Sequence, residues 1–402
     1  MCSTPEILNT IIKSHLCTGC AACAAVCPNE SITMQPDHEG FLYPQINETT
    51  CNGCEICSET CPVNQRISDD VQNEESNHEG PIGVFASWHL DEDIRRESSS
   101  GGVFTALAEA VIARDGVVAG SAFDDNLVAR HILIEASTDL DILRGSKYVQ
   151  SEVSPAIYHR ISEFLNHGRP VFFTGTPCQT AGLRNFLNKP YDNLLCCDMV
   201  CHGVPSLKVF SSYKIMLEQK YGAETGRIVF RRKDCGWKRY SVFLSFDNNT
   251  EYRRVFRTDP FMQAFLKNIC LRPSCYACKF RSITRPSDLT LGDFWGVGKK
   301  YQEYDLDDKG TSLILVNTKK GQSLLDACRT SLFLGLADIE TAVAGNLFLV
   351  QSCMRPPQRD TFYHDLGALS FETMVKKYRL YQPSFLRKVV RVLKSCVKNV
   401  FS

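Results

Sequence analysis

A short cysteine-rich segment occurs twice near the N-terminus, and its spacing restricts the possible folds more than any other feature. Each copy has the pattern C-x2-C-x2-C-x3-C followed directly by proline, and one constant offset relates the two copies. The cysteines are Cys17, Cys20, Cys23, Cys27, Cys51, Cys54, Cys57 and Cys61. Three closely spaced thiolates can surround one face of a compact metal centre, and the proline turns the chain away after the fourth. The repeat therefore predicts a small metal-binding domain over residues 1–65.

The spacing is typical of ferredoxins with two 4Fe-4S clusters, in which the fourth cysteine of each run binds the other cluster. It predicts a first ligand set of Cys17, Cys20, Cys23 and Cys61. It predicts a second ligand set of Cys51, Cys54, Cys57 and Cys27. Gly19 and Gly53 would let the backbone approach the sulfurs and provide amides to them. Zinc sites and disulfides are the alternatives, but zinc sites use separated pairs of ligands rather than triplets.

Composition argues against several other classes of protein. The chain has 402 residues with 45 basic and 45 acidic side chains, whereas nucleic-acid-binding proteins usually carry a basic excess. The first 16 residues contain no long apolar core, and no stretch reaches the roughly 18 apolar residues of a membrane-spanning helix. Of the 20 cysteines, none lies between residues 61 and 178. These features predict a cytoplasmic protein whose thiols serve metal or redox chemistry rather than disulfides.

The remainder of the chain predicts an α+β organisation. Residues 66–80 are polar and acidic, as in a linker. Residues 81–345 alternate strand and helix patterns, which indicates a mixed α/β domain with a more antiparallel region near 227–256. Residues 346–402 are predicted to form a helical extension that ends in a basic amphipathic helix. Such a helix can lie on an anionic membrane surface, on a partner subunit or on the body of the protein.

Four further cysteines lie where α/β folds build binding sites. Cys178 and Cys201 each follow a predicted strand, and Cys275 and Cys278 form a C-x2-C pair. Strand ends at one edge of an open sheet commonly form ligand sites. Four thiolates from three loops could therefore hold a third 4Fe-4S cluster, with buried core thiols as the alternative.

Other cysteines show no ligand pattern. Cys196 and Cys197 lie within a predicted strand, so we expect both in the core. The cysteines without any partner pattern are Cys270, Cys328, Cys353 and Cys396. We expect none of them to take part in a metal site.

A second candidate site lies at Ser98–Gly102 (SSSGG), directly before a predicted helix. Exposed amides, hydroxyls and the helix dipole can bind a phosphate there, whereas an ordinary serine N-cap is the alternative. The chain has no G-x-G-x-x-G fingerprint, so a standard dinucleotide domain is not supported. His202 beside Cys201 could donate a proton near a flavin or substrate, or make a structural hydrogen bond.

Several segments together resemble the coenzyme F-420 hydrogenase/dehydrogenase beta-subunit family. In chain order they are SSSGGVFTAL (98–107), RGSKYVQS (144–151), FTGTPCQTAGL (173–183), DMVCHGVPS (198–206), LRPSCYACKF (271–280) and LTLGDFWG (289–296). With the duplicated cysteine run, the match covers about residues 1–320. Family members bind FAD and iron–sulfur clusters, and they exchange electrons with a deazaflavin or another two-electron acceptor. Relatives include a chlorophyll-pathway hydroxymethyl reductase and bacterial proteins from polysaccharide-synthesis clusters.

The resemblance implies further site residues. The residues that match segments lying near the flavin nucleotide are Ser100, Gly101, Gly102, Lys147, Tyr148 and Gln150. The cysteines that match family positions for a third cluster are Cys178, Cys201, Cys275 and Cys278. Asp293 and Trp295 match a motif that shapes the site. The segment 232–237 (RKDCGW) could meet an anionic substrate group or form a solvated hairpin turn.

The resemblance implies an iron–sulfur flavoprotein oxidoreductase. Electrons would pass from 4Fe-4S clusters through FAD to coenzyme F-420 or another small acceptor, one setting being polysaccharide synthesis. The alternative is an electron-transfer subunit that serves a partner enzyme and has no substrate of its own. A redox partner protein or small acceptor is expected, nucleic acid is not, and the basic tail could give peripheral membrane contact.

Overall fold

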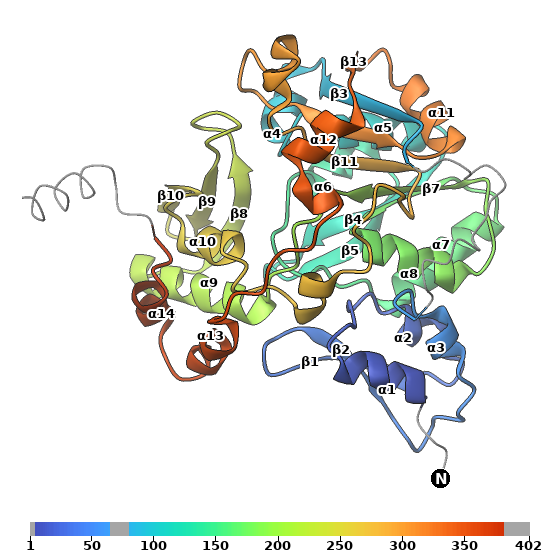
Figure 1. The fold of residues 1–402 in the computed structure, drawn as a ribbon, viewed down its shortest axis with the longest axis vertical. Coiled ribbons are helices and arrows are strands. Elements are labelled where there is room, and N and C mark those ends of the chain that lie inside the picture. Colours follow the sequence, from blue (N-terminus) through green and yellow to red (C-terminus); the bar gives the residue numbers. More distant parts are fainter. Residues whose placement is uncertain (1–4, 65–79, 382–402) are drawn as a thin grey trace, which may run out of the picture.

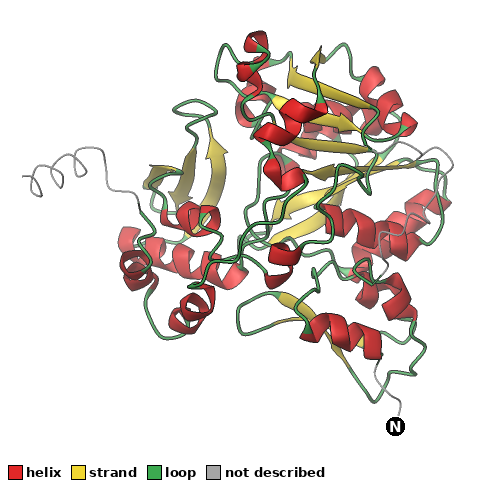
Figure 2. Ribbon diagram, viewed as in Figure 1, coloured by secondary structure: helices red, strands yellow, loops and turns green. Residues whose placement is uncertain are grey.

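The structure is a computed structural model that describes residues 5–64 and 80–381 (Figure 1). The predicted linker, apart from Gly80, and the predicted basic helix after residue 381 lie outside the described residues, as does Cys396. The strands of the described residues form three sheets, and the predicted α+β class is confirmed (Figure 2). Within those residues, no helix is long and apolar enough to cross a membrane.

The N-terminal region is a small layer of short helices over one hairpin. Its elements are α1 (Glu6–Lys13), α2 (Ala22–Val26), β1 (Ile32–Pro36), β2 (Leu42–Ile46) and α3 (Ile56–Thr60). β1 and β2 pair in antiparallel register, with Ile32 opposite Ile46. This region lies against α7 and α8 of the larger body (Figure 1).

A mixed eight-stranded sheet forms the centre of the body, in the order β13-β3-β12-β11-β7-β6-β4-β5. Its strands are β3 (Gly83–His89), β4 (Val117–Phe123), β5 (Ala129–Ile134), β6 (Val171–Gly175), β7 (Leu194–Met199), β11 (Leu289–Asp293), β12 (Ser312–Val316) and β13 (Leu332–Leu336). The four neighbouring strands β4, β6, β7 and β11 are parallel. Their carboxyl ends therefore meet at one edge of the sheet, where open α/β folds bind ligands.

Helices accompany this sheet. They are α4 (Glu92–Glu97), α5 (Val103–Ile112), α6 (Leu140–Leu143), α7 (Pro155–Asn166), α8 (Pro177–Leu187), α11 (Lys319–Ala327) and α12 (Ile339–Gly345). The short 3-10 helices are η1 (Ser137–Asp139), η2 (Pro273–Ala277), η3 (Val297–Lys299), η4 (Gln302–Tyr304) and η5 (Leu347–Leu349). The sequence predicts that α8 begins at residue 180, but it begins at Pro177. Thr176 and Gln179 form a capping box there, and proline is favoured in a first helical turn.

A three-stranded antiparallel sheet and four helices form a second core. The strands are β8 (Thr225–Arg232), β9 (Ser241–Phe246) and β10 (Glu251–Val255), as the alternating pattern near 227–256 predicts. The helices are α9 (Leu207–Tyr221), α10 (Pro260–Leu266), α13 (Arg359–Leu366) and α14 (Phe371–Lys377). Aromatic side chains dominate this core, where the rings of Phe210 and Phe261 lie 5.5 Å apart. α13 and α14 contribute Phe362 and Met374 to the same core, so the C-terminal helices are integral to the body.

Candidate functional site

The two cysteine runs fold alike. Gly19 and Gly53 have φ values of 71° and 72°, and each lies in the turn before a short helix. Ala21 and Glu55, the residues before α2 and α3, are also left-handed at 66° and 62°. Only glycine adopts this conformation without steric cost, which explains the glycine between the first two cysteines of each run. The sequence repeat is thus a structural repeat.

The first predicted ligand set is buried at the face of the N-terminal region that meets the body. Its four cysteines, Cys17, Cys20, Cys23 and Cys61, are each between 7% and 8% exposed. Burial and the adjacent Cys61 thiol raise the pKa of Cys20 well above its ordinary value. Burial also raises the pKa of Cys23 and Cys61, so binding of iron by these thiols and by Cys20 would release protons.

The second predicted ligand set lies closer to solvent. A small cavity is lined by its four cysteines, which are Cys27, Cys51, Cys54 and Cys57. Cys54 is exposed, Cys27 and Cys51 are partly buried, and Cys57 is buried. The two sets therefore differ in access: one faces solvent, and the other faces the body.

Loops from three parts of the body bring the other four predicted cysteines together. Cys178 lies in the first turn of α8, Cys201 follows β7, and Cys275 and Cys278 belong to the η2 loop. Burial, together with the neighbouring Cys201 and Cys278 thiols, raises the pKa of Cys178 to about 12. Burial raises the pKa of Cys275 as well, and the Cys201 and Cys278 thiols contribute to this rise. The convergence that the sequence could only suggest is present in the fold.

This third group lies beside the first ligand set. The Cys178 thiol contributes to the raised pKa of Cys20. A Cβ atom built on Gly182 of α8 would lie 3.1 Å from the Cys20 sulfur, so α8 packs directly on that cysteine. Tyr158 of α7 also donates a hydrogen bond of 2.6 Å to the Cys20 carbonyl oxygen.

The described residues contain no three His, Cys, Asp or Glu side chains arranged to share one metal ion. A four-iron cube holds its thiolates farther apart than the ligands of a single ion. Positive groups surround the third group of thiols: Arg281 donates to the carbonyl oxygens of Cys201 and His202. Burial raises the pKa of both Cys178 and Cys201; Arg272 opposes this rise at Cys178, and Arg281 and Arg285 oppose it at Cys201. Such cations stabilise thiolates, which is what cluster ligation needs.

A cavity of about 1340 Å³ adjoins these thiols at the carboxyl edge of the sheet. Of the residues expected near a flavin, those that line it are Ser100, Gly102, Lys147, Tyr148 and Gln150, whereas Gly101 does not. Cys178 and Cys201 line the same cavity. Its Phe, Tyr and Trp lining consists of Phe104, Tyr148, Tyr240, Phe256, Phe265, Trp295 and Phe348. Two buried hydroxyls on its wall, those of Thr18 and Ser121, have no hydrogen-bond partner, as expected where a ligand binds.

The loop Ser98–Gly102 is held rigidly at the cavity wall. Ser99 accepts a hydrogen bond from the Ser146 amide at 2.8 Å. The Gly101 amide donates to Ser312 Oγ at 2.8 Å. A Cβ on Gly101 would lie 2.3 Å from the Ser87 carbonyl oxygen, so only glycine fits there. Gly101 therefore lets the loop pack closely while its neighbours face the cavity.

Lys147 and Gln150 have partners that the sequence does not reveal. The Lys147 ammonium group donates to three carbonyl oxygens at the end of α6, those of Ile142, Leu143 and Arg144. Burial lowers the pKa of Lys147 to about 7. Gln150 Oε1 accepts from the Leu42 amide and from Arg272, each at 3.3 Å, so it joins the N-terminal hairpin to the cavity wall.

The segment 232–237 lies in the connection between the antiparallel strands β8 and β9, with Asp234 and Cys235 exposed, so the hairpin-turn interpretation is confirmed in part. The Lys233 ammonium group turns inward and donates to the carbonyl oxygens of Arg95, Ser100 and Lys309. Trp237 is 1% exposed and donates to Asp293 Oδ1 at 2.7 Å. Within this turn, Lys233 supports the Ser98–Gly102 loop through Ser100 rather than facing a substrate.

Asp293 and Trp295 organise one wall of the cavity. Asp293 accepts two hydrogen bonds from the buried Arg231 guanidinium, one of them 2.6 Å long. Trp295 stacks on Trp237 with ring centroids 4.4 Å apart. His202 hydrogen-bonds Asn268 and stacks on Phe348, which is the structural role considered above.

Cys353 is buried in the second core, as expected for a cysteine without a ligand pattern. This buried thiol donates to the Cys275 carbonyl oxygen at 3.6 Å and lines the cavity. It is a single cysteine far along the chain from the other thiols, so no spacing pattern marks it. Cys196, Cys197, Cys270 and Cys328 are also buried, as expected for core thiols.

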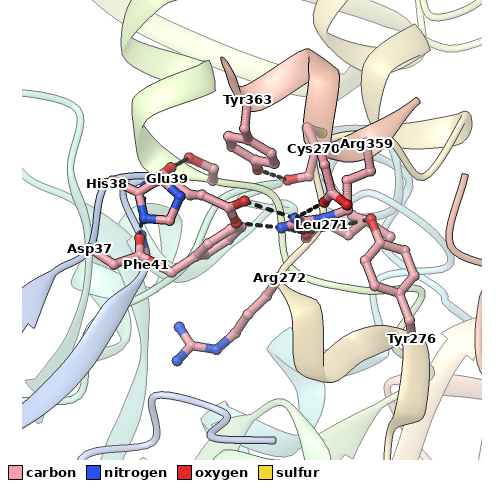
Figure 3. Close-up of polar contacts among 12 residues, drawn as sticks. Asp37, His38, Glu39, Phe41, Cys270, Leu271, Arg272, Tyr276, Arg359 and Tyr363 are labelled. Atoms are coloured by element: carbon pink, nitrogen blue, oxygen red, sulfur yellow. Dashed lines mark hydrogen bonds and ion pairs between the residues drawn. The ribbon is translucent and has the colours of Figure 1, made fainter. Parts of the chain in front are cut away.

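The N-terminal region is fixed to the body by two arginines. Arg272 donates to the Cys17 carbonyl oxygen at 2.7 Å and to the Leu42 carbonyl oxygen at 2.9 Å. Arg359 pairs with Glu39 in the loop between β1 and β2 (Figure 3). Backbone and side chains beside the first ligand set are therefore held by the body itself.

Comparison with known proteins identifies the relatives of this arrangement. Residues 16–65 match a 4Fe-4S dicluster domain. A chain of the F420-reducing NiFe hydrogenase complex from Methanosarcina barkeri is 15% identical, with a TM-score of 0.44 over 67% of this chain and 90% of that chain. A search of curated proteins gave no match. Residues 84–158 and 168–342 match the N-terminal and C-terminal parts of the coenzyme F420 hydrogenase/dehydrogenase beta subunit. These two matches span more than half of the chain, which therefore belongs to that beta-subunit family.

Proposed function

We propose that this protein is an iron–sulfur flavoprotein oxidoreductase that exchanges electrons with a small two-electron acceptor. The observation that carries the proposal is the large cavity, which is lined by Cys178 and Cys201 and also by the Ser98–Gly102 loop. Thiols suited to a cluster and a loop suited to a nucleotide phosphate thus border the same space. That arrangement is what electron exchange between the two groups would need.

The residues present fit the groups that the family implies. The proposed ligand sets are Cys17, Cys20, Cys23 and Cys61; Cys27, Cys51, Cys54 and Cys57; and Cys178, Cys201, Cys275 and Cys278. The cavity volume of about 1340 Å³ exceeds the roughly 300–1,000 Å³ of ordinary ligand pockets, which leaves room for FAD and an acceptor together. When bound, the clusters and flavin would supply the conversion between one-electron and two-electron transfer.

The chain itself would position and insulate these groups. The three sets of cysteines follow one another in space. The first contains the exposed Cys54, the next contains the buried Cys20, and the last contains Cys178 at the cavity. Arg272 and Arg281 provide positive charge beside the innermost thiols, which lowers the cost of keeping thiolates in a buried place. The aromatic lining excludes water from the cavity wall and offers flat surfaces for a ring system.

The acceptor class follows from the family, and coenzyme F-420 is one candidate for it. A second function, electron transfer to a partner enzyme without a substrate of its own, is supported by the solvent-facing Cys54 set. Such an exposed thiol set suits exchange with a redox partner protein. The large cavity favours the enzyme over this alternative, because a simple electron carrier needs no substrate space.

Iron and flavin content per chain, measured on anaerobically purified protein, tests the proposal. We expect about twelve irons, which is three four-iron clusters, and one FAD. About eight irons with no flavin would overturn it in favour of the electron-transfer role. Tight zinc with no iron would exclude both functions.

A further inference from the structure

A fifth thiol lies at the third group of cysteines. Cys353 is 3% exposed, and its thiol donates to the carbonyl oxygen of Cys275 at 3.6 Å. Ser352, the residue before it, accepts a hydrogen bond from the Cys278 amide at 3.1 Å. Two adjacent residues are therefore bound directly to the loop that carries the C-x2-C pair. They belong to a segment after residue 342, where the match to the family ends.

Arg281 joins this segment to the rest of the site. Its guanidinium group donates to the carbonyl oxygens of Cys201 and Phe348. The same cation opposes the effect of burial, which raises the pKa of Cys353 to about 11. The thiols of Cys201 and Cys278 also contribute to the raised pKa of Cys353. Cys353 therefore shares its electrostatic environment with two of the proposed cluster ligands.

Cys270 provides a comparison in the same region. It is fully buried, and its carbonyl oxygen accepts a hydrogen bond from Tyr363 (Figure 3). Burial raises the pKa of Cys270 to about 12, and Arg359 opposes this, whereas no other thiol contributes. Both cysteines are thus buried in the same region, but only Cys353 has thiols of the third group as neighbours.

We propose that Cys353 is an exchangeable ligand of the third 4Fe-4S cluster, able to bind the iron that Cys278 otherwise holds. This inference rests on the proposed function, because it requires the third cluster. In the exchange, the iron–sulfur bond to Cys278 breaks and one to Cys353 forms. The proton released by the Cys353 thiol passes to the departing Cys278 thiolate, so neither net charge nor oxidation state changes.

Iron and sulfide content of anaerobically purified variants tests the inference. The variants are Cys278→Ser, Cys353→Ser, the double variant Cys278→Ser/Cys353→Ser, and the control Cys278→Ser/Cys270→Ser. We expect about twelve irons in both single variants and in the control, but about eight in the double variant. The electron paramagnetic resonance signal of the third cluster should persist in Cys278→Ser with shifted line positions, because one ligand has changed.

Each other outcome overturns a specific claim. If Cys278→Ser alone falls to about eight irons while the unmodified protein holds about twelve, Cys353 does not replace Cys278. If Cys353→Ser alone loses four irons, Cys353 is an obligatory ligand rather than an exchangeable one. If the unmodified protein itself holds only about eight, the third cluster is absent, and the proposed function fails together with this inference. The irons of the two N-terminal clusters report that each variant has folded.

Discussion

Glu39 and Arg359 form a buried ion pair that joins the β1–β2 loop to α13 across 320 positions of sequence. The Nη1–Oε1 distance is 2.8 Å, and a second hydrogen bond completes the two-fold contact. The side chains are 9% and 2% exposed, respectively. Arg359 also donates to the Leu271 carbonyl oxygen at 2.9 Å, next to Arg272 (Figure 3). The pair therefore helps to hold the N-terminal region in place beside the body.

Replacing Arg359 with methionine should destabilise the protein strongly. The substitution leaves the Glu39 carboxylate buried without a cation, and breaking a buried pair in this way costs about 3–5 kcal/mol. We expect a lower urea midpoint in denaturation followed by circular dichroism. The double variant Glu39→Met/Arg359→Met should recover much of this loss, because it removes both charges together.

Arg355→Met is the matched control. Arg355 pairs with Asp360 on the surface, where the two side chains are 53% and 71% exposed. Exposed pairs of this kind contribute about 1 kcal/mol or less. Equal losses in Arg355→Met and Arg359→Met would show that burial of the Glu39 pair does not matter to stability.

His131 should make the fold sensitive to acid. Burial lowers the pKa of His131 to about 4, although its ring bonds the Thr174 carbonyl oxygen and Ser151 Oγ. The unfolded chain, with an ordinary histidine pKa near 6.5, binds the proton first as pH falls. The stability contributed by the neutral ring is therefore complete above about pH 6.5 and declines as pH falls toward 4. The loss amounts to about 2 kcal/mol by pH 5.

Denaturation of the wild type and His131→Asn at pH 7.5 and pH 5 isolates this effect. The stability difference between the two proteins should shrink by about 2 kcal/mol over that interval, because only the wild type carries the buried imidazole. His364→Asn is the control, since the His364 side chain is 85% exposed. A difference for His131→Asn that stays constant with pH would contradict the assignment.

Local features were predicted from the sequence far better than contacts between distant segments. The spacing of Cys17, Cys20 and Cys23 reports their own geometry, because a few residues of chain restrict where neighbouring thiols can lie. Periodicity likewise identified the strands β6 and β7, because each buries a run of apolar side chains. The order and direction of the parallel strands then brought Cys178 and Cys201 to one edge.

Contacts that depend on the packing of distant segments could not be predicted from patterns in the sequence. Glu39 and Arg359 are single charged residues in polar surroundings, and only the docking of α13 on the hairpin loop makes them partners. Cys353 is isolated in the chain, so its approach to Cys275 depends on the path of the segment after α12. Lys233 stands among other basic residues in the sequence and therefore resembled a surface cation. The carbonyl oxygens that it binds, such as that of Arg95, belong to distant segments that only the fold brings near.

Gly101→Ala should reduce flavin retention. A methyl group there would lie 2.3 Å from the Ser87 carbonyl oxygen and 2.9 Å from Ser312 Oγ, so the Ser98–Gly102 loop must shift. We expect substoichiometric FAD after gel filtration, while the iron content stays near that of the wild type. Gly80→Ala is the control, because its added methyl group would meet only the Ile283 side chain, at 3.4 Å. Full FAD retention in Gly101→Ala would separate this loop from the flavin site.

Cys178→Ser should remove one cluster and leave the others. Cys178 lies on α8, whereas the thiols that contribute to the raised pKa of Cys353 are those of Cys201 and Cys278. Cys353 is therefore not placed to replace Cys178 as a ligand. We expect iron to fall by about four per chain. Cys196→Ser, at a buried cysteine of β7, should keep the full iron content. Equal iron in both variants would mean that Cys178 is a core thiol. A loss of all iron in Cys178→Ser would instead tie assembly of the N-terminal clusters to the body, because α8 packs directly on Cys20.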